Sequence, residues 1–235
     1  MISIKNISRR KFLSLAGSTG MGVLAAGCSK SSNTPPVEVV TAVESLNRHH
    51  GLLHRSIAIL EEIRGGMDAR MDLPPEIIQN TVDIVRRFVV DYHQKMEEKY
   101  ILPPFDTAKK MGGLVGVIRE QHAAGAQVVD ILKNLSVGFS AKDLEKRRTL
   151  GSAIHQFSRM YRAHSEREDT VLFPALWQVL PPKAYSEMNA VFMKSEKEAL
   201  GPSGFDEAIQ KLSSIENVLG IGDLAGFTPR VDELN

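Results

Sequence analysis

A short pattern that occurs twice constrains the fold of this chain more than any other feature. The pattern is His, three residues, Glu, and a Pro six residues after the Glu. The two copies, HQKMEEKYILP and HSEREDTVLFP, contain His93, Glu97 and Pro103, and His164, Glu168 and Pro174. On an α-helix a residue and its fourth successor lie on one face, so each copy presents an imidazole and a carboxylate in one direction. These side chains are metal ligands, and their repetition indicates a metal bound between helices.

A further His precedes each copy at nearly the same distance. His50 stands 43 residues before His93, and His122 stands 42 residues before His164. The chain therefore contains two copies of one arrangement, a helix with a single His followed by a helix with His-x-x-x-Glu. One His-x-x-x-Glu alone is more often a solvated surface pair. Two copies with matching flanking residues favour a metal site built from four His and two Glu.

Hydrophobic spacing from residue 37 onward is helical throughout. We expect four long helices, at residues 38–64, 74–102, 114–135 and 142–174. Gly65 and Gly66 should stop the first, and Pro103 and Pro174 should end or bend the second and fourth. Two shorter helices are expected at 181–200 and 206–219, before an apolar tail that either caps the bundle or forms an interface. The predicted fold is all-α, an antiparallel four-helix bundle with two extra C-terminal helices.

The first 27 residues have the features of an export signal. SRRKFL at 8–13 resembles a twin-arginine signal, and the apolar run that follows is too short for a stable anchor. AAGC at 25–28 resembles a lipobox, with Leu24 one place earlier than the preferred Leu. We predict lipidation of Cys28, a twin-arginine exported protein of the periplasm or cell envelope, and membrane attachment through this lipid only. Ordinary cleavage nearby, giving a soluble envelope protein, is the alternative.

Composition excludes several classes of site. The 235 residues are 43% hydrophobic, enough for one sizeable core or at most two small ones. A net charge of +1 gives no electrostatic argument for a nucleic-acid partner. Cys28 is the only cysteine, which excludes a zinc–thiolate or iron–sulfur site. We expect a signal peptide at 1–27, a flexible tether at 28–37, a metal-binding bundle at 38–180 and a helical extension at 181–235.

Four segments together resemble the hemerythrin-like, or HHE cation-binding, domain over roughly residues 40–179. They are NRHHGLL, DYHQKMEEKYILP, REQHAAG and YRAHSEREDTVLFP. The resemblance implies a non-haem di-iron centre, oxo- or hydroxo-bridged, with two Glu bridging the irons and the His capping them. By residue-to-residue match, the implied ligands are His50, His93, Glu97, His122, His164 and Glu168. Ligands of this kind suit Fe and also accept Mn or Zn.

The chain departs from the oxygen-carrying hemerythrins in its third helix. Those proteins carry His-x-x-x-His there, whereas Ala126 stands four residues after His122. The site would lack one imidazole, and an open coordination position favours reaction with a small molecule. In the fourth helix the oxygen carriers use an Asp five residues after the His, where this chain has Asp169. Glu168 is preferred because it repeats Glu97, and Asp169 is the alternative ligand.

Three other side chains lie on ligand-bearing faces. His54 follows His50 by four residues and is either an alternative ligand, a core residue or a hydrogen-bond partner of the ligands. Tyr161 and Tyr100 either donate hydrogen bonds to ligands or bound oxygen species, or pack as ordinary half-buried residues.

Some neighbours of the ligands receive no role in the site. His49 is expected to turn away from His50 and to be partly exposed, and His155 to face away from the site. Glu98 is expected to be solvated, with Arg119 as a surface partner.

The sequence is compatible with two functions. In the first, the metal pair binds or senses O2, NO or peroxide, or holds iron itself. In the second, an oxidoreductase acts on these molecules with an electron donor, or the protein delivers iron for cluster repair. The first is preferred because the chain has no obvious reductase domain or electron-transfer motif, and the redox partner is unknown. A bundle without metal would leave buried polar pairs uncompensated, which is costly.

Overall fold

The computed structural model describes residues 40–69, 74–140 and 142–231, and every regular element in these ranges is helical. The all-α prediction is therefore confirmed. The predicted signal, the tether and Cys28 lie outside the described residues. No helix in the described ranges combines the length and apolarity needed to cross a membrane.

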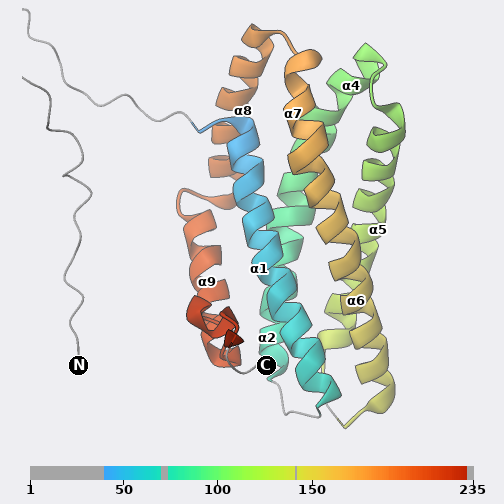
Figure 1. Ribbon diagram of the computed structural model, residues 1–235, viewed down its shortest axis with the longest axis vertical. Helices are drawn as coiled ribbons and strands as arrows, with labels where there is room; N and C mark the ends of the chain where they lie inside the picture. The colour runs from blue at the N-terminus through green and yellow to red at the C-terminus, as the bar shows by residue number, and fades with distance from the viewer. Residues whose placement is uncertain (1–39, 70–73, 141, 232–235) are drawn as a thin grey trace, which may run out of the picture. The chain divides into compact units, whose positions relative to one another are not determined.

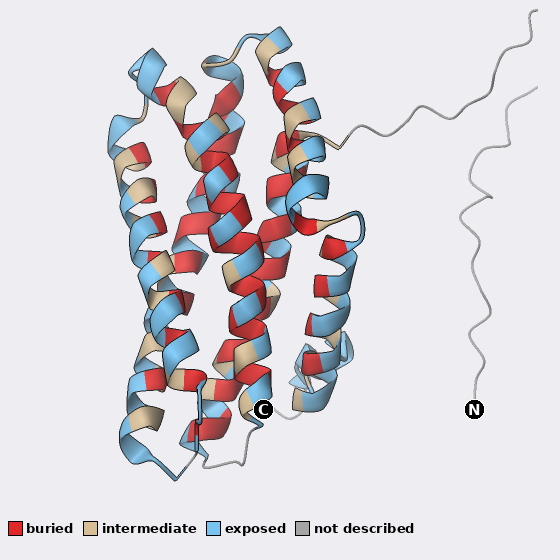
Figure 2. Cartoon of the chain, turned by 180° about the vertical axis from the view of Figure 1, so that it is seen from behind, coloured by how far each residue is buried: buried red, intermediate tan, exposed pale blue. Residues whose placement is uncertain are grey.

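Four long helical rods form an antiparallel bundle (Figure 1). Bundle helix 1 is α1 (Ala42–Asp68) and bundle helix 3 is α5 (Gly112–Ser136). Bundle helix 2 is continuous through α2 (Pro75–Ile84), η1 (Val85–His93), α3 (Gln94–Met96), η2 (Glu97–Ile101) and α4 (Leu102–Ala108). Bundle helix 4 comprises α6 (Leu144–Arg167), η3 (Glu168–Leu172), α7 (Phe173–Ala175) and η4 (Leu176–Gln178). Their buried faces meet in one core (Figure 2).

Local sequence explains where the long helices begin. Thr41 caps α1 by accepting from the Glu44 amide, while the Glu44 carboxylate accepts from the Thr41 amide. This reciprocal capping box satisfies two amides that the first turn leaves unpaired. Asp143 caps α6 by accepting from the Lys146 amide. Both caps fix the start of a helix that carries a ligand of the predicted site.

The expected stop at Gly65 and Gly66 is wrong, because α1 continues to Asp68. The two glycines cost the helix about 1 kcal/mol each relative to Ala. Ile63 and Met67 on the same stretch are buried in the core, each to 1% exposure or less. Burying these two side chains contributes more, about 1.5–3 kcal/mol each.

Neither proline of the repeat ends its helix. Pro103 and Pro174 lie in the first turns of α4 and α7, and each follows a π-helical segment, η2 or η3. A proline has no amide hydrogen for the carbonyl four residues earlier. Those carbonyls belong to Lys99 and Thr170, both inside the π-helical segments. The helix thus widens before the proline and continues past it.

The two C-terminal helices, α8 (Pro182–Leu200) and α9 (Gly204–Leu219), are present as expected. They pack against α1 and bundle helix 2. The Asn189 side chain in α8 accepts from the Ala42 amide at 2.9 Å, and Glu216 in α9 pairs with Arg55. These contacts cover the outer side of α1.

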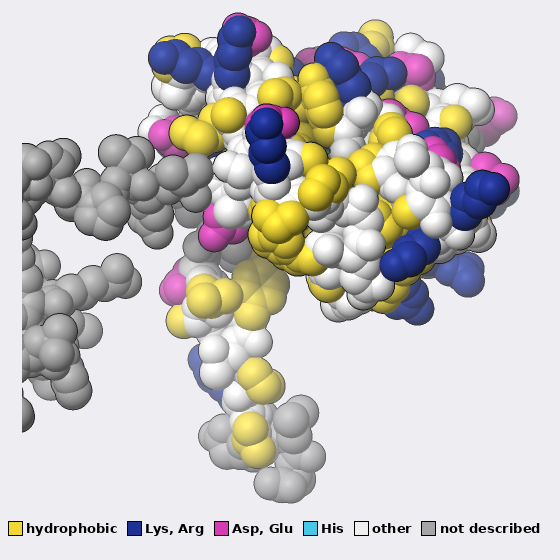
Figure 3. All heavy atoms as spheres, turned by 90° about the horizontal axis from the view of Figure 1, so that it is seen from above, with side chains coloured by type: hydrophobic (Ala, Val, Ile, Leu, Met, Phe, Trp, Pro, Cys, Tyr) yellow, Lys and Arg dark blue, Asp and Glu magenta, His cyan; other side chains and the backbone are white. Residues whose placement is uncertain are grey.

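The tail after α9 forms a short 3₁₀ turn, η5 (Leu224–Phe227). Leu224 and Phe227 are exposed, so their side chains do not cap the core. The end of the bundle at which α1 begins carries hydrophobic side chains among charged ones (Figure 3). Trp177 is exposed and stacks on Tyr185 of α8, with 3.9 Å between ring centroids.

Candidate metal centre

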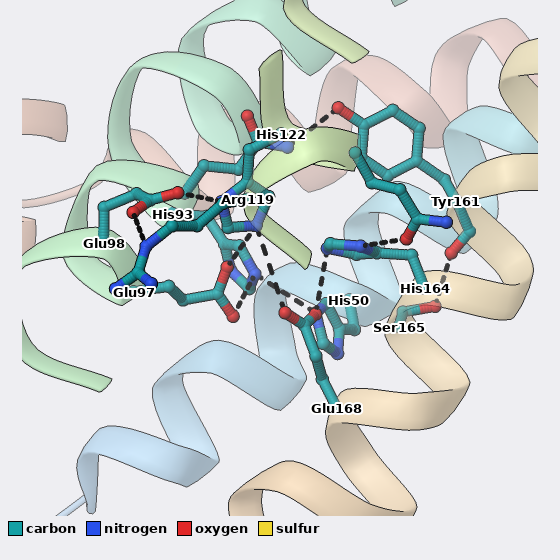
Figure 4. Close-up of polar contacts among 12 residues, drawn as sticks. His50, His93, Glu97, Glu98, Arg119, His122, Tyr161, His164, Ser165 and Glu168 are labelled. Atoms are coloured by element: carbon teal, nitrogen blue, oxygen red, sulfur yellow. Dashed lines mark hydrogen bonds and ion pairs between the residues drawn. The ribbon is translucent and has the colours of Figure 1, made fainter. Parts of the chain in front are cut away.

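The six side chains singled out by the repeat converge inside the bundle (Figure 4). Each of the four bundle helices contributes at least one of them. All are buried, with 0–6% of each residue exposed: His50, His93, Glu97, His122, His164 and Glu168. Acidic and imidazole groups are seldom buried together unless they are paired or bind a metal.

The ligand atoms form two overlapping groups. One consists of His50, His93, Glu97 and Glu168, and the other of Glu97, His122, His164 and Glu168. Within each group the ligand atoms lie within 4.8 Å of one another. Because both groups contain both carboxylates, the arrangement suits two ions bridged by Glu97 and Glu168.

Distances between the ligand atoms agree with such bridging. The two oxygens of Glu97 face different imidazoles, with Oε1 3.1 Å from His93 Nε2 and Oε2 3.3 Å from His122 Nε2. Glu168 Oε2 lies 3.3 Å from His50 Nε2 and 3.2 Å from His164 Nε2. His50 Nε2 and His93 Nε2 are 3.1 Å apart. Roughly 3 Å separates neighbouring ligands on an ion whose metal–nitrogen bonds are about 2.0–2.1 Å.

Several of these buried atoms have no hydrogen-bond partner among the described residues. They are both carboxylate oxygens of Glu97, both of Glu168, and Nε2 of His122. A buried polar atom without a partner costs free energy, and buried charges are normally paired or coordinate metals. The residues therefore fit a bound metal pair on the geometry and chemistry of their donor atoms.

Electrostatics within the cluster point the same way. Burial raises the pKa of Glu97, but His93 and His122 outweigh this effect and hold the pKa well below its usual range. Burial lowers the pKa of His50, but the hydrogen bond to Asp169 and the nearby Glu168 carboxylate raise it to about 10. The pKa of His122 is also raised, because Glu97 and Glu98 outweigh burial. The protons on these imidazoles balance the buried carboxylates, a role that a metal cation takes over when it binds.

Three of the four imidazoles have a hydrogen-bond partner at Nδ1, the nitrogen that points away from the cluster. Asp169 Oδ1 lies 2.7 Å from His50 Nδ1, Glu98 Oε1 2.8 Å from His122 Nδ1, and Gln121 Oε1 3.0 Å from His164 Nδ1. With a metal bound at Nε2, Nδ1 would carry the hydrogen and donate it to these oxygens. Such contacts orient the ring and increase the basicity of the ligand nitrogen.

Two of these partners differ from expectation. Asp169, the alternative ligand, lies outside both ligand groups and holds His50 instead. Glu98 was expected to be solvated, but it is about two-thirds buried and pairs with both His122 and Arg119. The repeat carried the signal for both: each follows a Glu shared by the two ligand groups, and each holds the single His of the opposite copy.

The other residues considered from the sequence lie around the site. His54 is exposed, belongs to neither ligand group, and has Nε2 2.8 Å from Ser165 Oγ. Tyr161 is fully buried, and its hydroxyl accepts a hydrogen bond from Nε2 of the Gln94 side chain at 2.8 Å. Tyr100 is half-buried and packs edge-on against Phe192. His155 is exposed, as expected.

Gly125 of α5 makes room for Tyr161. A Cβ placed on Gly125 would lie 2.1 Å from the Tyr161 hydroxyl oxygen, so only glycine fits there. Ala126, which stands where the oxygen carriers have a fifth His, follows this glycine and is partly buried. The Tyr161 ring packs edge-on against His164, with centroids 5.7 Å apart. Tyr161 therefore lies between Gly125 and the His164 ring, beside the candidate ligands.

His49 was expected to be partly exposed, and this expectation is wrong. The residue is 1% exposed, and its ring stacks on Phe205 of α9. Helices α8 and α9 were expected, but the sequence did not indicate that they would cover this side of α1. Burial, followed by the influence of His93 and Arg48, lowers the pKa of His49 well below its usual value.

Comparison with known proteins agrees with this geometry. The model of the hemerythrin HHE cation binding domain matches residues 41–176. Uncharacterized proteins of Mycobacterium tuberculosis (strain H37Rv) and Mycobacterium bovis are each 34% identical to the chain over 233 residues, covering 95% of it and 91% of their own length. No solved structure matches the chain. With a family match over more than half of its length, and with His and Glu clusters that fit a metal site, the chain belongs to the hemerythrin HHE cation-binding family.

Proposed function

We propose that the protein binds a non-haem di-iron centre and uses it to bind or sense a small molecule such as O2, NO or peroxide, or to hold iron. The observation that carries this proposal is the sharing of Glu97 and Glu168 by two ligand groups. A single ion would leave one pair of imidazoles without a metal. Two ions use all six side chains.

The ligand set favours iron while also accepting Mn or Zn. Each ion would receive two imidazoles and share two carboxylates, which leaves coordination positions open at both ions. When bound, iron supplies one-electron redox chemistry and affinity for small oxygen- or nitrogen-containing molecules. The absence of a fifth imidazole at Ala126 supports this use over a closed structural site.

The protein's own residues restrict what reaches the centre. The six ligand residues are at most 6% exposed, so a large substrate would not contact them. Phe173 stacks on His50 with centroids 5.7 Å apart and excludes water from that side. Asp169 and Glu98 hold the hydrogens on His50 Nδ1 and His122 Nδ1, so that Nε2 of each ring stays free to bind metal.

An oxidoreductase acting on O2, peroxide or NO, or an iron-delivery protein for cluster repair, is the second candidate. The open positions at both ions favour it, since a small molecule could bind between them. This function needs an external electron donor. Turnover of peroxide or NO by the iron-loaded protein with a supplied reductant would select it over binding.

Metal analysis and an optical spectrum of protein folded with iron test the proposal. We expect two irons per chain, and a spectrum that changes on exposure to O2, peroxide or NO. Fewer than about one iron per chain, or unchanged metal content when His93 and Glu97 are both replaced, would contradict the di-iron assignment.

The envelope location belongs to the same proposal, with export by the twin-arginine route and a lipid on Cys28. It is supported by residues 8–13 and 25–28 of the sequence. Incorporation of a labelled fatty acid by the wild type and not by Cys28→Ala would support the anchor. Equal labelling of both would contradict it.

A further inference from the structure

One imidazole of the metal centre differs from the other three. His93 is 2% exposed, its Nε2 faces Glu97, and its Nδ1 has no hydrogen-bond partner. The corresponding nitrogens of the other three are held by Asp169, Glu98 and Gln121. A metal on Nε2 places the hydrogen on Nδ1 of His93, where a buried donor without an acceptor is costly.

The side chain that faces this gap is His49. Its ring centroid lies 5.7 Å from that of His93, so a hydrogen bond between the two rings needs their facing nitrogens to turn toward each other and the rings to approach by about half an ångström. Both nitrogens of His49 are buried and have no hydrogen-bond partner. A neutral imidazole has one donor and one acceptor nitrogen, so His49 can accept from His93 and donate elsewhere.

An acceptor for the second nitrogen lies on α8. Glu196 Oε2 is 3.7 Å from His49 Nε2, and the same carboxylate accepts from Ser45 Oγ at 2.6 Å and lies 3.8 Å from Arg48. Phe205 stacks on one face of the His49 ring, and Tyr92 packs edge-on against it. The ring is thus confined between His93 and Glu196.

The internal repeat gives an independent argument for this pairing. His49 directly precedes His50, just as Gln121 directly precedes His122. In the second copy, Gln121 Oε1 lies 3.0 Å from Nδ1 of His164, the His of that copy's His-x-x-x-Glu. The equivalent His in the first copy is His93, and the residue in the place of Gln121 is His49.

We propose that His49 is a positioning residue of the metal centre, which accepts the Nδ1 hydrogen of His93 and is itself held by Glu196 of α8. The inference rests on the proposed metal function. It gives the C-terminal extension a role, because α8 and α9 supply the carboxylate and the aromatic ring that fix His49. His49 acts through His93 and does not bind the metal.

The test replaces His49 in two ways and measures retention of iron against a chelator, together with the visible spectrum. His49→Phe keeps an aromatic ring among Phe88, Tyr92 and Phe205 but removes the acceptor. We expect about 10–100-fold weaker iron binding and an altered spectrum. His49→Gln introduces the residue type that contacts His164 in the second half. We therefore expect iron binding and a spectrum close to those of the wild type.

Glu196→Ala tests the outer link without changing the buried position, and Glu198→Ala is its control. Glu198 lies on the same helix, is mostly exposed and pairs only with Lys194 among the contacts described. We expect weaker iron retention for Glu196→Ala and none of this loss for Glu198→Ala. If His49→Phe does not fold, as judged by circular dichroism of the metal-free protein, the Glu196 pair and His49→Gln decide the question.

The outcomes separate this inference from the proposed function. Wild-type protein without iron contradicts the proposed function itself. Wild-type protein with two irons, together with a His49→Phe variant that holds them equally well, overturns only the role of His49. Equal losses in His49→Phe and His49→Gln also overturn it, since packing alone would then explain the effect. If the Glu196→Ala and Glu198→Ala variants retain iron equally well, Glu196 of α8 does not support His49.

Discussion

The two halves of the bundle carry equivalent candidate ligands but support them differently. In each half a single His is followed by a His-x-x-x-Glu that enters a π-helical segment before a proline. In each, the residue after the bridging Glu holds the single His of the other half. The halves differ at the residue that precedes the single His. This residue is the buried His49 in the first half and the partly exposed Gln121 in the second.

This difference follows from what covers each half. Helices α8 and α9 pack against α1 and bundle helix 2, both of which belong to the first half. A buried imidazole can be kept between His93 and Glu196 only because these helices exclude water from it. The comparison teaches that the internal repeat determines the candidate ligands. The residues that contact these ligands from outside depend instead on which helices cover each half.

Removing a bridging carboxylate should have the largest effect. Because both ligand groups contain Glu97 and Glu168, we expect Glu97→Gln and Glu168→Gln each to lose both irons. Metal analysis of the purified variants measures this, with exposed Glu166→Gln as the control. A variant that keeps one iron would show that the halves do not share that carboxylate.

Removing a capping imidazole should affect one half only. His50 belongs to one ligand group and His122 to the other, so His50→Ala and His122→Ala should each retain about one iron per chain. The same metal analysis measures this. Complete loss in either variant would mean that the two ions bind only together, and two irons in either would exclude that residue as a ligand.

The carboxylates behind the imidazoles should contribute equally in the two halves. Asp169 and Glu98 have similar exposure, 36% and 35% of the side chain, and similar distances to their imidazoles. We expect Asp169→Ala and Glu98→Ala each to weaken iron binding about 10–100-fold. Competition with a chelator measures the loss. A much larger loss in one variant would break the equivalence of the halves at this layer.

Metal affinity should fall as the pH falls. The pKa of His50 is raised to about 10 and that of His122 is raised as well, so metal binding near neutral pH displaces protons from both halves. Each displaced proton lowers the apparent affinity up to about tenfold per pH unit below the pKa. Titration with Zn²⁺ as a probe between about pH 6 and pH 8 measures the slope. An affinity independent of pH would show that these imidazoles are not metal ligands.

The smallest expected effect distinguishes two glycines near the single His residues. A methyl group on Gly125 meets the Tyr161 hydroxyl, whereas a methyl group on exposed Gly51 meets nothing within 4 Å. We expect Gly125→Ala to destabilise the metal-free protein by about 1–3 kcal/mol. Gly51→Ala should stabilise it by about 0.5–1 kcal/mol, since Ala suits a helix interior better than Gly. Urea unfolding measures both, and equal effects would show that Tyr161 yields to the added methyl group.

The sequence was sufficient to predict the helices and the convergence of the six repeat side chains. Helical spacing encodes which residues face inward, and the repeat identifies side chains that meet by approximate symmetry. The π-helical turns η2 and η3 were not predictable in this way, because they depend on a carbonyl losing its donor at Pro103 or Pro174 within a packed helix. The burial of His49 depends on α8 and α9, whose packing partners the pattern does not specify.

The crossed support of the two single His residues means that neither half is a functional unit. A hairpin of α1 and bundle helix 2 would contain His50 and His93 but lack Asp169, and its Glu97 and Glu98 would face the missing His122. Such a hairpin holds half of each hydrogen-bonded pair. Only two copies, joined in one chain or associated as two, bring together all the side chains of the two ligand groups.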